Sequence, residues 1–155
     1  MRALNSISLL ISTFFYLGYL PFIAGTFGSL AGILLFFWVK DSIFAYALVT
    51  LATLVLGFLF SGKAERALAR KVPPCVVIDE VSGMLVALMF LPHQPAVMII
   101  AFFLFRLLDT VKPYPANSLQ RFKGSFGIMA DDIVAAVYTN IVLQLALRLA
   151  SFRAS

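Results

Sequence analysis

The stretch from Phe105 to Asp132, FRLLDTVKPYPANSLQRFKGSFGIMADD, decides how the rest of this chain is organised. It holds three of the seven carboxylates and four of the twelve basic residues, in a chain that is 62% hydrophobic and only 12% charged. Charged groups are costly beside apolar surroundings unless they pair or bind ions. The stretch therefore predicts a polar site at a membrane edge, with acids that hold a metal ion and basic groups that hold an anion.

The composition places the chain in a lipid bilayer. Its mean hydropathy of +1.00 exceeds that of ordinary globular domains. Because lipid offers the backbone no hydrogen-bond partners, and the apolar runs are long and do not alternate, the spanning elements should be helices. We expect one domain, residues 1–155, with an all-α, polytopic membrane fold of about four to five membrane-embedded helices. The single Cys75 excludes an intramolecular disulfide.

Breaks in the apolar runs delimit the expected helices. Residues 4–20 fit a tilted, re-entrant or interfacial helix as well as a full span. After Pro21, a helix capped by Thr26 or Ser29 should run to about Val39. The expected spanning helices after it are Ser42–Phe60, Cys75–Leu91, Ala96–Leu108 and Asp131 to about Leu149.

Loop charges orient these helices. The segment 63–71 carries four basic residues and one acid, Glu65, whereas the turn 91–95 carries no formal charge. The positive-inside rule puts the first segment in the cytoplasm. The acids at the helix ends and the small-residue turn 24–29 then share the cytoplasmic face. We expect Glu65 to be solvated and to pair with a neighbouring Lys or Arg.

Five acids in three short segments form the candidate metal site. They are Asp79, Glu80, Asp109, Asp131 and Asp132. Carboxylates gathered at low dielectric repel one another, and the two nearest basic residues, Arg106 and Lys112, cannot neutralise five of them. A divalent cation supplies the missing charge, and oxygen ligands without Cys or His suit Mg²⁺ or Mn²⁺.

Basic and small residues next to these acids form the candidate phosphate site. Its expected members are Arg106, Lys112, Lys123, Gly127, Thr26 and Ser29. A helix that starts near Thr26 would point free N–H groups at an anion. The spacing of Gly25, Gly28 and Gly32 has another reading, a close contact between helices. A metal, a phosphate and a water together predict hydrolysis of a phosphate ester.

Four motifs resemble those of the phosphatidylglycerophosphatase A family. They are GTFGS (25–29), VIDEVSGM (77–84), FRLLDTVKPYP (105–115) and GIMADDIVA (127–135). The resemblance implies a Mg²⁺-dependent, multi-pass enzyme of the bacterial inner membrane that removes the terminal phosphate of phosphatidylglycerophosphate. It assigns catalysis to Asp79, Glu80, Asp109, Lys112, Asp131 and Asp132.

The chain departs from the family pattern at two places. Val72 stands where an Asp is usual, so either that carboxylate is dispensable or Glu65 replaces it. Lys123-Gly124-Ser125 stands where His-Gly-Gly is usual, and Lys123 keeps the local charge positive.

Two other functions stay open at this point. A small transporter or channel would bind its cation near the bilayer midplane, whereas these acids lie at helix ends. A catalytically inactive lipid-binding subunit would keep the same motifs. The expected partners are a phospholipid substrate and the membrane, with no nucleic acid, and the oligomeric state stays open.

Overall fold

The computed structural model describes residues 2–20, 23–71 and 73–154, and within these ranges every regular element is helical. The expectation of an all-α fold is confirmed. The elements are α1 (Arg2–Ser12), the 3-10 turn η1 (Leu17–Tyr19), α2 (Ala24–Val39), α3 (Ile43–Ala67), α4 (Ile78–Leu88), α5 (Pro95–Val111), α6 (Ala116–Leu119) and α7 (Ser125–Ala154).

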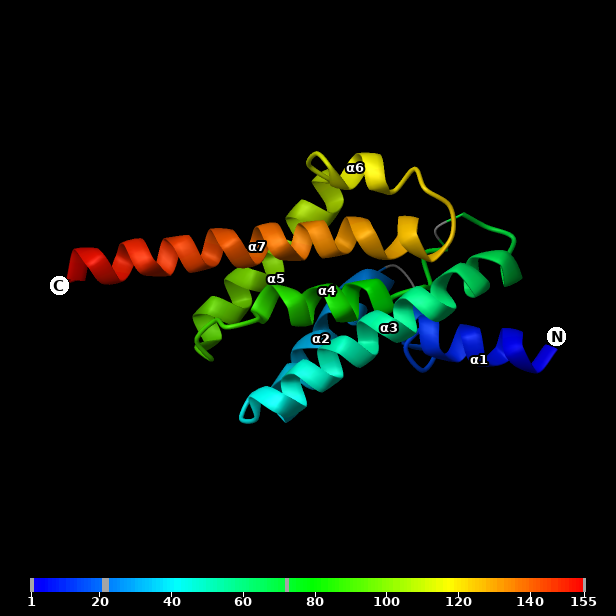
Figure 1. Cartoon of the computed structure of the whole chain (residues 1–155), viewed down its shortest axis with the longest axis horizontal. Coiled ribbons are helices and arrows are strands. Elements are labelled where there is room, and N and C mark those ends of the chain that lie inside the picture. Colours follow the sequence, from blue (N-terminus) through cyan, green and yellow to red (C-terminus); the bar gives the residue numbers. More distant parts are fainter. Residues whose placement is uncertain (1, 21–22, 72, 155) are drawn as a thin grey trace.

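Helix α4 lies at the centre of the bundle, with α2, α3, α5 and α7 packed around it (Figure 1). Nine of its eleven residues are buried. Its side chains Met84, Leu85 and Leu88 join Phe105 of α5 in the main hydrophobic cluster. The expected span Cys75–Leu91 is therefore wrong: an 11-residue helix is about 16 Å long, too short to cross a bilayer, and its apolar residues meet protein, not lipid.

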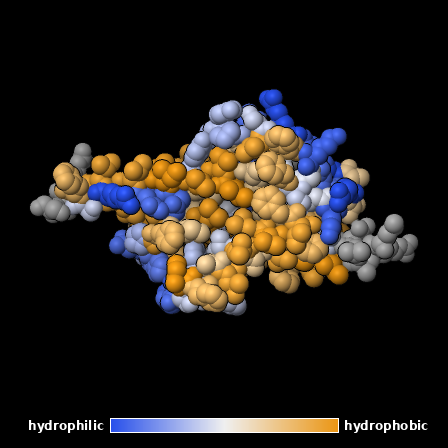
Figure 2. All heavy atoms as spheres, viewed as in Figure 1, coloured by the Kyte–Doolittle hydropathy of each residue, from blue (hydrophilic) through white to orange (hydrophobic). Residues whose placement is uncertain are grey.

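Two helices in the described part of the chain are long and apolar enough to cross a membrane. They are α3 and the stretch Ser125–Phe152 of α7, with hydropathies of 2.4 and 1.7. Only 22% of the most apolar window of each is buried, so most of their apolar side chains face outward. Hydrophobic residues cover the middle of the face seen in Figure 2, and hydrophilic residues gather toward the ends. Helix α2 is apolar but shorter, so the described structure supports fewer spans than the four to five expected.

Several helix ends differ from those expected. Helix α1 has only 11 residues, which excludes a full span there. Neither Thr26 nor Ser29 caps α2, since that helix begins at Ala24 without a side-chain cap. Helix α3 continues past Phe60 into the basic segment, and α7 begins at Ser125 rather than Asp131. Pro21 lies outside the described residues.

Small residues let α2 approach α4 closely. A Cβ atom added at Gly32 would lie 2.7 Å from Cβ of Met84 and 2.8 Å from the carbonyl oxygen of Val81. One added at Gly28 would lie 3.0 Å from Cβ of Val77. The prediction that the spaced glycines mark a close contact between helices is confirmed at Gly28 and Gly32.

We predict that Gly32→Val lowers the free energy of unfolding by about 1–3 kcal/mol, because the new side chain must push α2 away from the backbone of α4. Thermal unfolding in detergent measures the change. Leu34→Val is the matched control. It also introduces a valine into α2, but at a position where the Leu34 side chain is 65% exposed. Equal melting temperatures for the two variants would contradict the close packing.

Candidate active site

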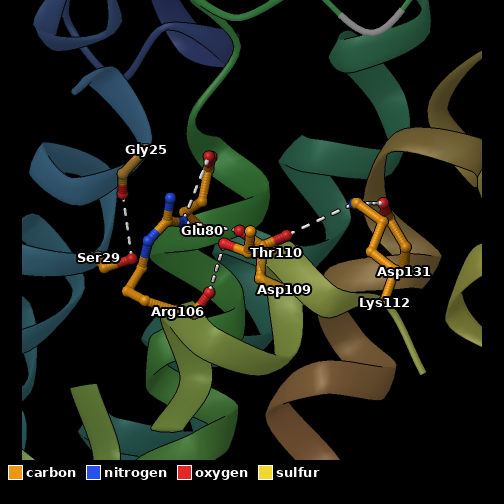
Figure 3. Close-up of polar contacts among 8 residues, drawn as sticks. All are labelled: Gly25, Ser29, Glu80, Arg106, Asp109, Thr110, Lys112 and Asp131. Carbon is orange, nitrogen blue, oxygen red and sulfur yellow. Dashed lines mark hydrogen bonds and ion pairs between the residues drawn. The ribbon is translucent and has the colours of Figure 1, made fainter. Parts of the chain in front are cut away.

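Four helix ends meet at one place, and three of them carry all the expected acids. Asp79 and Glu80 lie in the first turn of α4, and Asp109 lies in the last turn of α5. Asp131 and Asp132 lie near the start of α7, and the start of α2 faces Arg106 from the other side (Figure 3). The side chains of Arg106 and Lys112 lie between these acids.

Three of the carboxylates form a compact group that lacks sufficient positive charge. One oxygen each from Asp79, Glu80 and Asp132 lies within 4.8 Å of the others. Each residue also has a buried oxygen without a hydrogen-bond partner, namely Asp79 Oδ1, Glu80 Oε2 and Asp132 Oδ2. Arg106 lies beside this group, with its Nη1 3.9 Å from Glu80 Oε1, and Lys112 also interacts electrostatically with Asp132. Orphaned carboxylate oxygens gathered in this way suit a hard divalent cation.

The other two acids are paired with basic residues. Nη1 of Arg106 donates to Asp109 Oδ2 at 2.8 Å, and Nζ of Lys112 lies 3.5 Å from Asp109 Oδ1. Lys112 also donates to Asp131 Oδ2, which joins α5 to α7 (Figure 3). Asp131 Oδ1 is buried and unpartnered. Charges thus alternate from Glu80 through Arg106, Asp109 and Lys112 to Asp131.

The backbone at Lys112 positions its ammonium group. Helix α5 ends there because Lys112 adopts the left-handed conformation, with φ 49° and ψ 63°, while its N–H still bonds to Leu108. Burial lowers the pKa of the ammonium, but the hydrogen bond and charge of Asp131, with further charge from Asp109 and Asp132, raise that pKa above its usual value. Lys112 is therefore a cation at neutral pH.

A cavity of about 510 Å³ opens beside Arg106, between η1 and the starts of α2 and α4. Tyr19, Thr26, Cys75, Glu80 and Arg106 supply its polar lining. Gly25 leaves room for the guanidinium, since a Cβ atom there would lie 2.9 Å from Nη2 of Arg106. We did not expect Tyr19 and Cys75 at the site, because no motif marks them. Tyr19 reaches the cavity from the turn η1 before α2, and Cys75 reaches it from the segment before α4.

The structure places the other expected phosphate ligands differently. Thr26 lines the cavity, but Ser29 is fully buried and its hydroxyl donates to the carbonyl of Gly25 at 3.0 Å. Lys123 is exposed on the α6–α7 loop. Gly127 is buried against the carbonyl of Phe122, where a side chain would clash. Ser29 and Gly127 therefore act in packing in this structure.

Glu65 joins loop and helix instead of pairing with a basic residue. Its Oε1 accepts a hydrogen bond from the N–H of Gly124 at 3.3 Å, and no ion pair among the described residues involves it. The expected pairing with Lys or Arg is not confirmed, and the alternative that Glu65 replaces the missing acid stays a prediction. Val72 lies outside the described residues.

Sequence comparison assigns the chain to a family. The profile of phosphatidylglycerophosphatase A matches residues 10–147, which include every carboxylate and cation of the site. The chain belongs to this family. Membership makes it a phosphatase, and the site described above brings together acids from three motifs of this chain, 77–84, 105–115 and 127–135.

Curated relatives agree with this assignment. Phosphatidylglycerophosphatase A of Escherichia coli is 34% identical over 81% of this chain and 75% of its own length. The enzyme of the same name from Haemophilus influenzae is 32% identical, over 77% and 76% respectively. A protein of Bacteroides thetaiotaomicron, provisionally named phosphatidylinositol-3-phosphatase, is 35% identical over 94% and 97%. No solved structure matches the chain significantly.

We predict that Lys112→Met destabilises the protein by about 3–5 kcal/mol, because it leaves the buried carboxylate of Asp131 without its counter-charge. The double variant Lys112→Met/Asp131→Asn should recover most of that loss. Melting temperatures in detergent measure both. Lys40→Met is the control: Lys40 is similarly exposed, but its partner Asp41 is solvated, so little should change. A double variant no more stable than the single one would contradict the pairing.

Proposed function

We propose that this protein is a phosphatidylglycerophosphatase that uses Mg²⁺ or Mn²⁺ to hydrolyse the terminal phosphate of phosphatidylglycerophosphate, giving phosphatidylglycerol and phosphate. The observation that carries the proposal is the group of Asp79, Glu80 and Asp132, with orphaned buried oxygens, directly beside Arg106. The names of the relatives from E. coli and H. influenzae support this substrate.

The carboxylates fit the expected metal. The metal would be held by Asp79, Glu80 and Asp132, with Asp109 and Asp131 beside them. These are the five acids that we expected as metal ligands and catalytic groups. When bound, such an ion would polarise a phosphate oxygen and lower the pKa of a water. The same donors exclude soft metals, because the group contains neither thiolate nor imidazole.

The basic side chains would bind and orient the phosphate group. Arg106 presents planar N–H donors toward the cavity, a geometry that suits phosphate oxygens. Lys112 holds a proton on Nζ at neutral pH and can donate it in a hydrogen bond to an anion. Thr26 and the free N–H groups at the start of α2 face the same cavity and add donors. Lys123, on its exposed loop, would contribute only long-range attraction.

A second candidate substrate is a phosphoinositide with a 3-phosphate. The relative from B. thetaiotaomicron, which aligns with nearly the whole chain, carries that activity in its name. Both substrates are phosphate monoesters on a lipid headgroup, so the same donors serve either. A transporter is less well supported, since the acids sit at helix ends and not midway along spanning helices.

We further propose that residues 1–155 form one domain, multi-pass in the bacterial inner membrane, with the site facing the cytoplasm. Two basic loops support this orientation. Lys71, after α3, donates to the carbonyl of Arg121, after α6, at 3.3 Å, so both loops lie at the same end of the molecule. Helix α7, whose first turns carry Asp131 and Asp132, follows directly from the second loop. Basic loops favour the cytoplasmic side.

We predict that purified protein releases phosphate from phosphatidylglycerophosphate only with Mg²⁺ or Mn²⁺. Asp79→Asn and Asp132→Asn should each lower the rate by about a thousandfold or more, because each removes a charge that holds the metal and with it the stabilisation of the transition state. Mg²⁺ should also raise the melting temperature of the wild type but not of these variants. Asp41→Asn, a change at an exposed acid, is the control. The phosphoinositide is assayed in parallel. Full activity in excess chelator would overturn the metal requirement.

Cysteine labelling tests the orientation. In a Cys75→Ser background, a cysteine placed by Ser118→Cys should react with a membrane-impermeant thiol reagent only after cells are opened. One placed by Gln94→Cys should react once the outer barrier alone is permeabilised. Both positions are exposed, so accessibility to the reagent depends on the side of the membrane. The reverse pattern would place the site on the opposite face.

A further inference from the structure

An apolar groove of about 360 Å³ runs along the seam between α2 and α5. Its lining is almost wholly apolar and includes Leu30, Ile33 and Phe37 of α2 with Met98, Ile99 and Phe102 of α5. Many of these side chains are open to the outside; Ile99, for instance, is 57% exposed. The groove is therefore a surface depression that lipid can enter.

The groove exists because α2 and α5 are held apart by α4. Gly28 and Gly32 draw α2 onto α4, and α5 packs mainly against α7 and α4. As a result α2 and α5 touch each other only sparsely, although both pack next to the central helix α4 (Figure 1). Aromatic and aliphatic side chains line this seam without filling it.

One end of the groove leads to the candidate active site. Phe102 lies four residues before Arg106 on α5, and Leu30 lies four residues after Thr26 on α2. Each step is about one helical turn, or about 6 Å. The cavity that Arg106 and Thr26 line thus continues from the same two helices that form the groove. A polar cavity followed by an apolar groove matches the two parts of a phospholipid.

Other exposed apolar surfaces lack this arrangement. Leu48 and Leu51 of α3 are 56% and 59% exposed, but none of the residues that line the cavity beside Arg106 belongs to α3. The cavity around Lys40, Tyr46 and His93 lies at the far end of α2 from the phosphate-binding residues. Of these described surfaces, the α2–α5 groove is the one whose apolar lining comes from the two helices that also supply Thr26 and Arg106 to the site cavity.

We propose that the α2–α5 groove binds one acyl chain of the lipid substrate while the headgroup phosphate lies at Arg106. This inference rests on the proposed function and extends it to the lipid part of the substrate. Contact with the chain would hold the headgroup at a fixed depth relative to the carboxylates. It would also let the substrate enter sideways from the bilayer without withdrawing its chains from lipid.

The first test compares two substrates that share a headgroup and differ in their acyl chains. With Ile99→Trp, which fills the groove, KM for dioleoyl phosphatidylglycerophosphate in detergent micelles should rise about tenfold with kcat unchanged, since the acyl-chain contact that is lost is the same in the ground state and the transition state. The kcat/KM for the soluble dihexanoyl analogue should stay at the wild-type value. Leu48→Trp is the matched control at equal exposure and should leave both substrates unaffected. If the two variants behave alike, or if Ile99→Trp impairs both substrates equally, the inference is overturned.

The second test does not depend on turnover. A phosphatidic acid that carries a photoreactive diazirine on one chain should cross-link to peptides that contain residues 30–37 and 95–103, more than to the exposed face of α3. Ile99→Trp should reduce this labelling. Equal labelling of α3, or labelling that Ile99→Trp leaves unchanged, would overturn the inference. Groove labelling in a protein that hydrolyses no lipid would sustain the inference while the proposed function fails.

Discussion

Excess negative charge, buried where α4 and α7 begin, is the constraint on which this structure depends. Arg106 and Lys112 pair with Asp109 and Asp131, which leaves Asp79 and Asp132 without an ion pair among the described residues. The helix N-termini offset part of this charge, and burial of carboxylates without a counter-charge is costly. A cation bound there would attract a phosphate group to the same place, and Arg106 already lies beside it.

The central position of α4 keeps these charges fixed relative to one another. Gly83 lets Phe105 of α5 approach α4, since a Cβ atom there would lie 2.7 Å from the phenyl ring. Gly32 does the same for α2. Because the acids stand on helices that pack through buried contacts, rather than on loops, their separation depends on core packing. The same packing leaves the α2–α5 seam open.

The two cavities suit the two parts of an amphiphilic substrate. Hydrogen-bond donors and charges surround the cavity next to Arg106, whereas apolar side chains line the groove between α2 and α5. A soluble phosphatase needs only the first. The polar cavity and the apolar groove are both built on α2 and α5. An enzyme that acts on phospholipid headgroups can therefore use helices that are apolar along most of their length and polar at one end.

The sequence by itself determined the helical class, the five acids and the two basic residues of the site, because hydropathy and side-chain chemistry are properties of single residues. Only the tertiary structure decided that α4 is a buried core helix, since hydropathy does not distinguish a protein interior from lipid. It also separated the paired acids Asp109 and Asp131 from the orphaned group, and brought Tyr19 and Cys75 to the cavity. These outcomes depend on contacts between segments far apart in the chain, which no local pattern records.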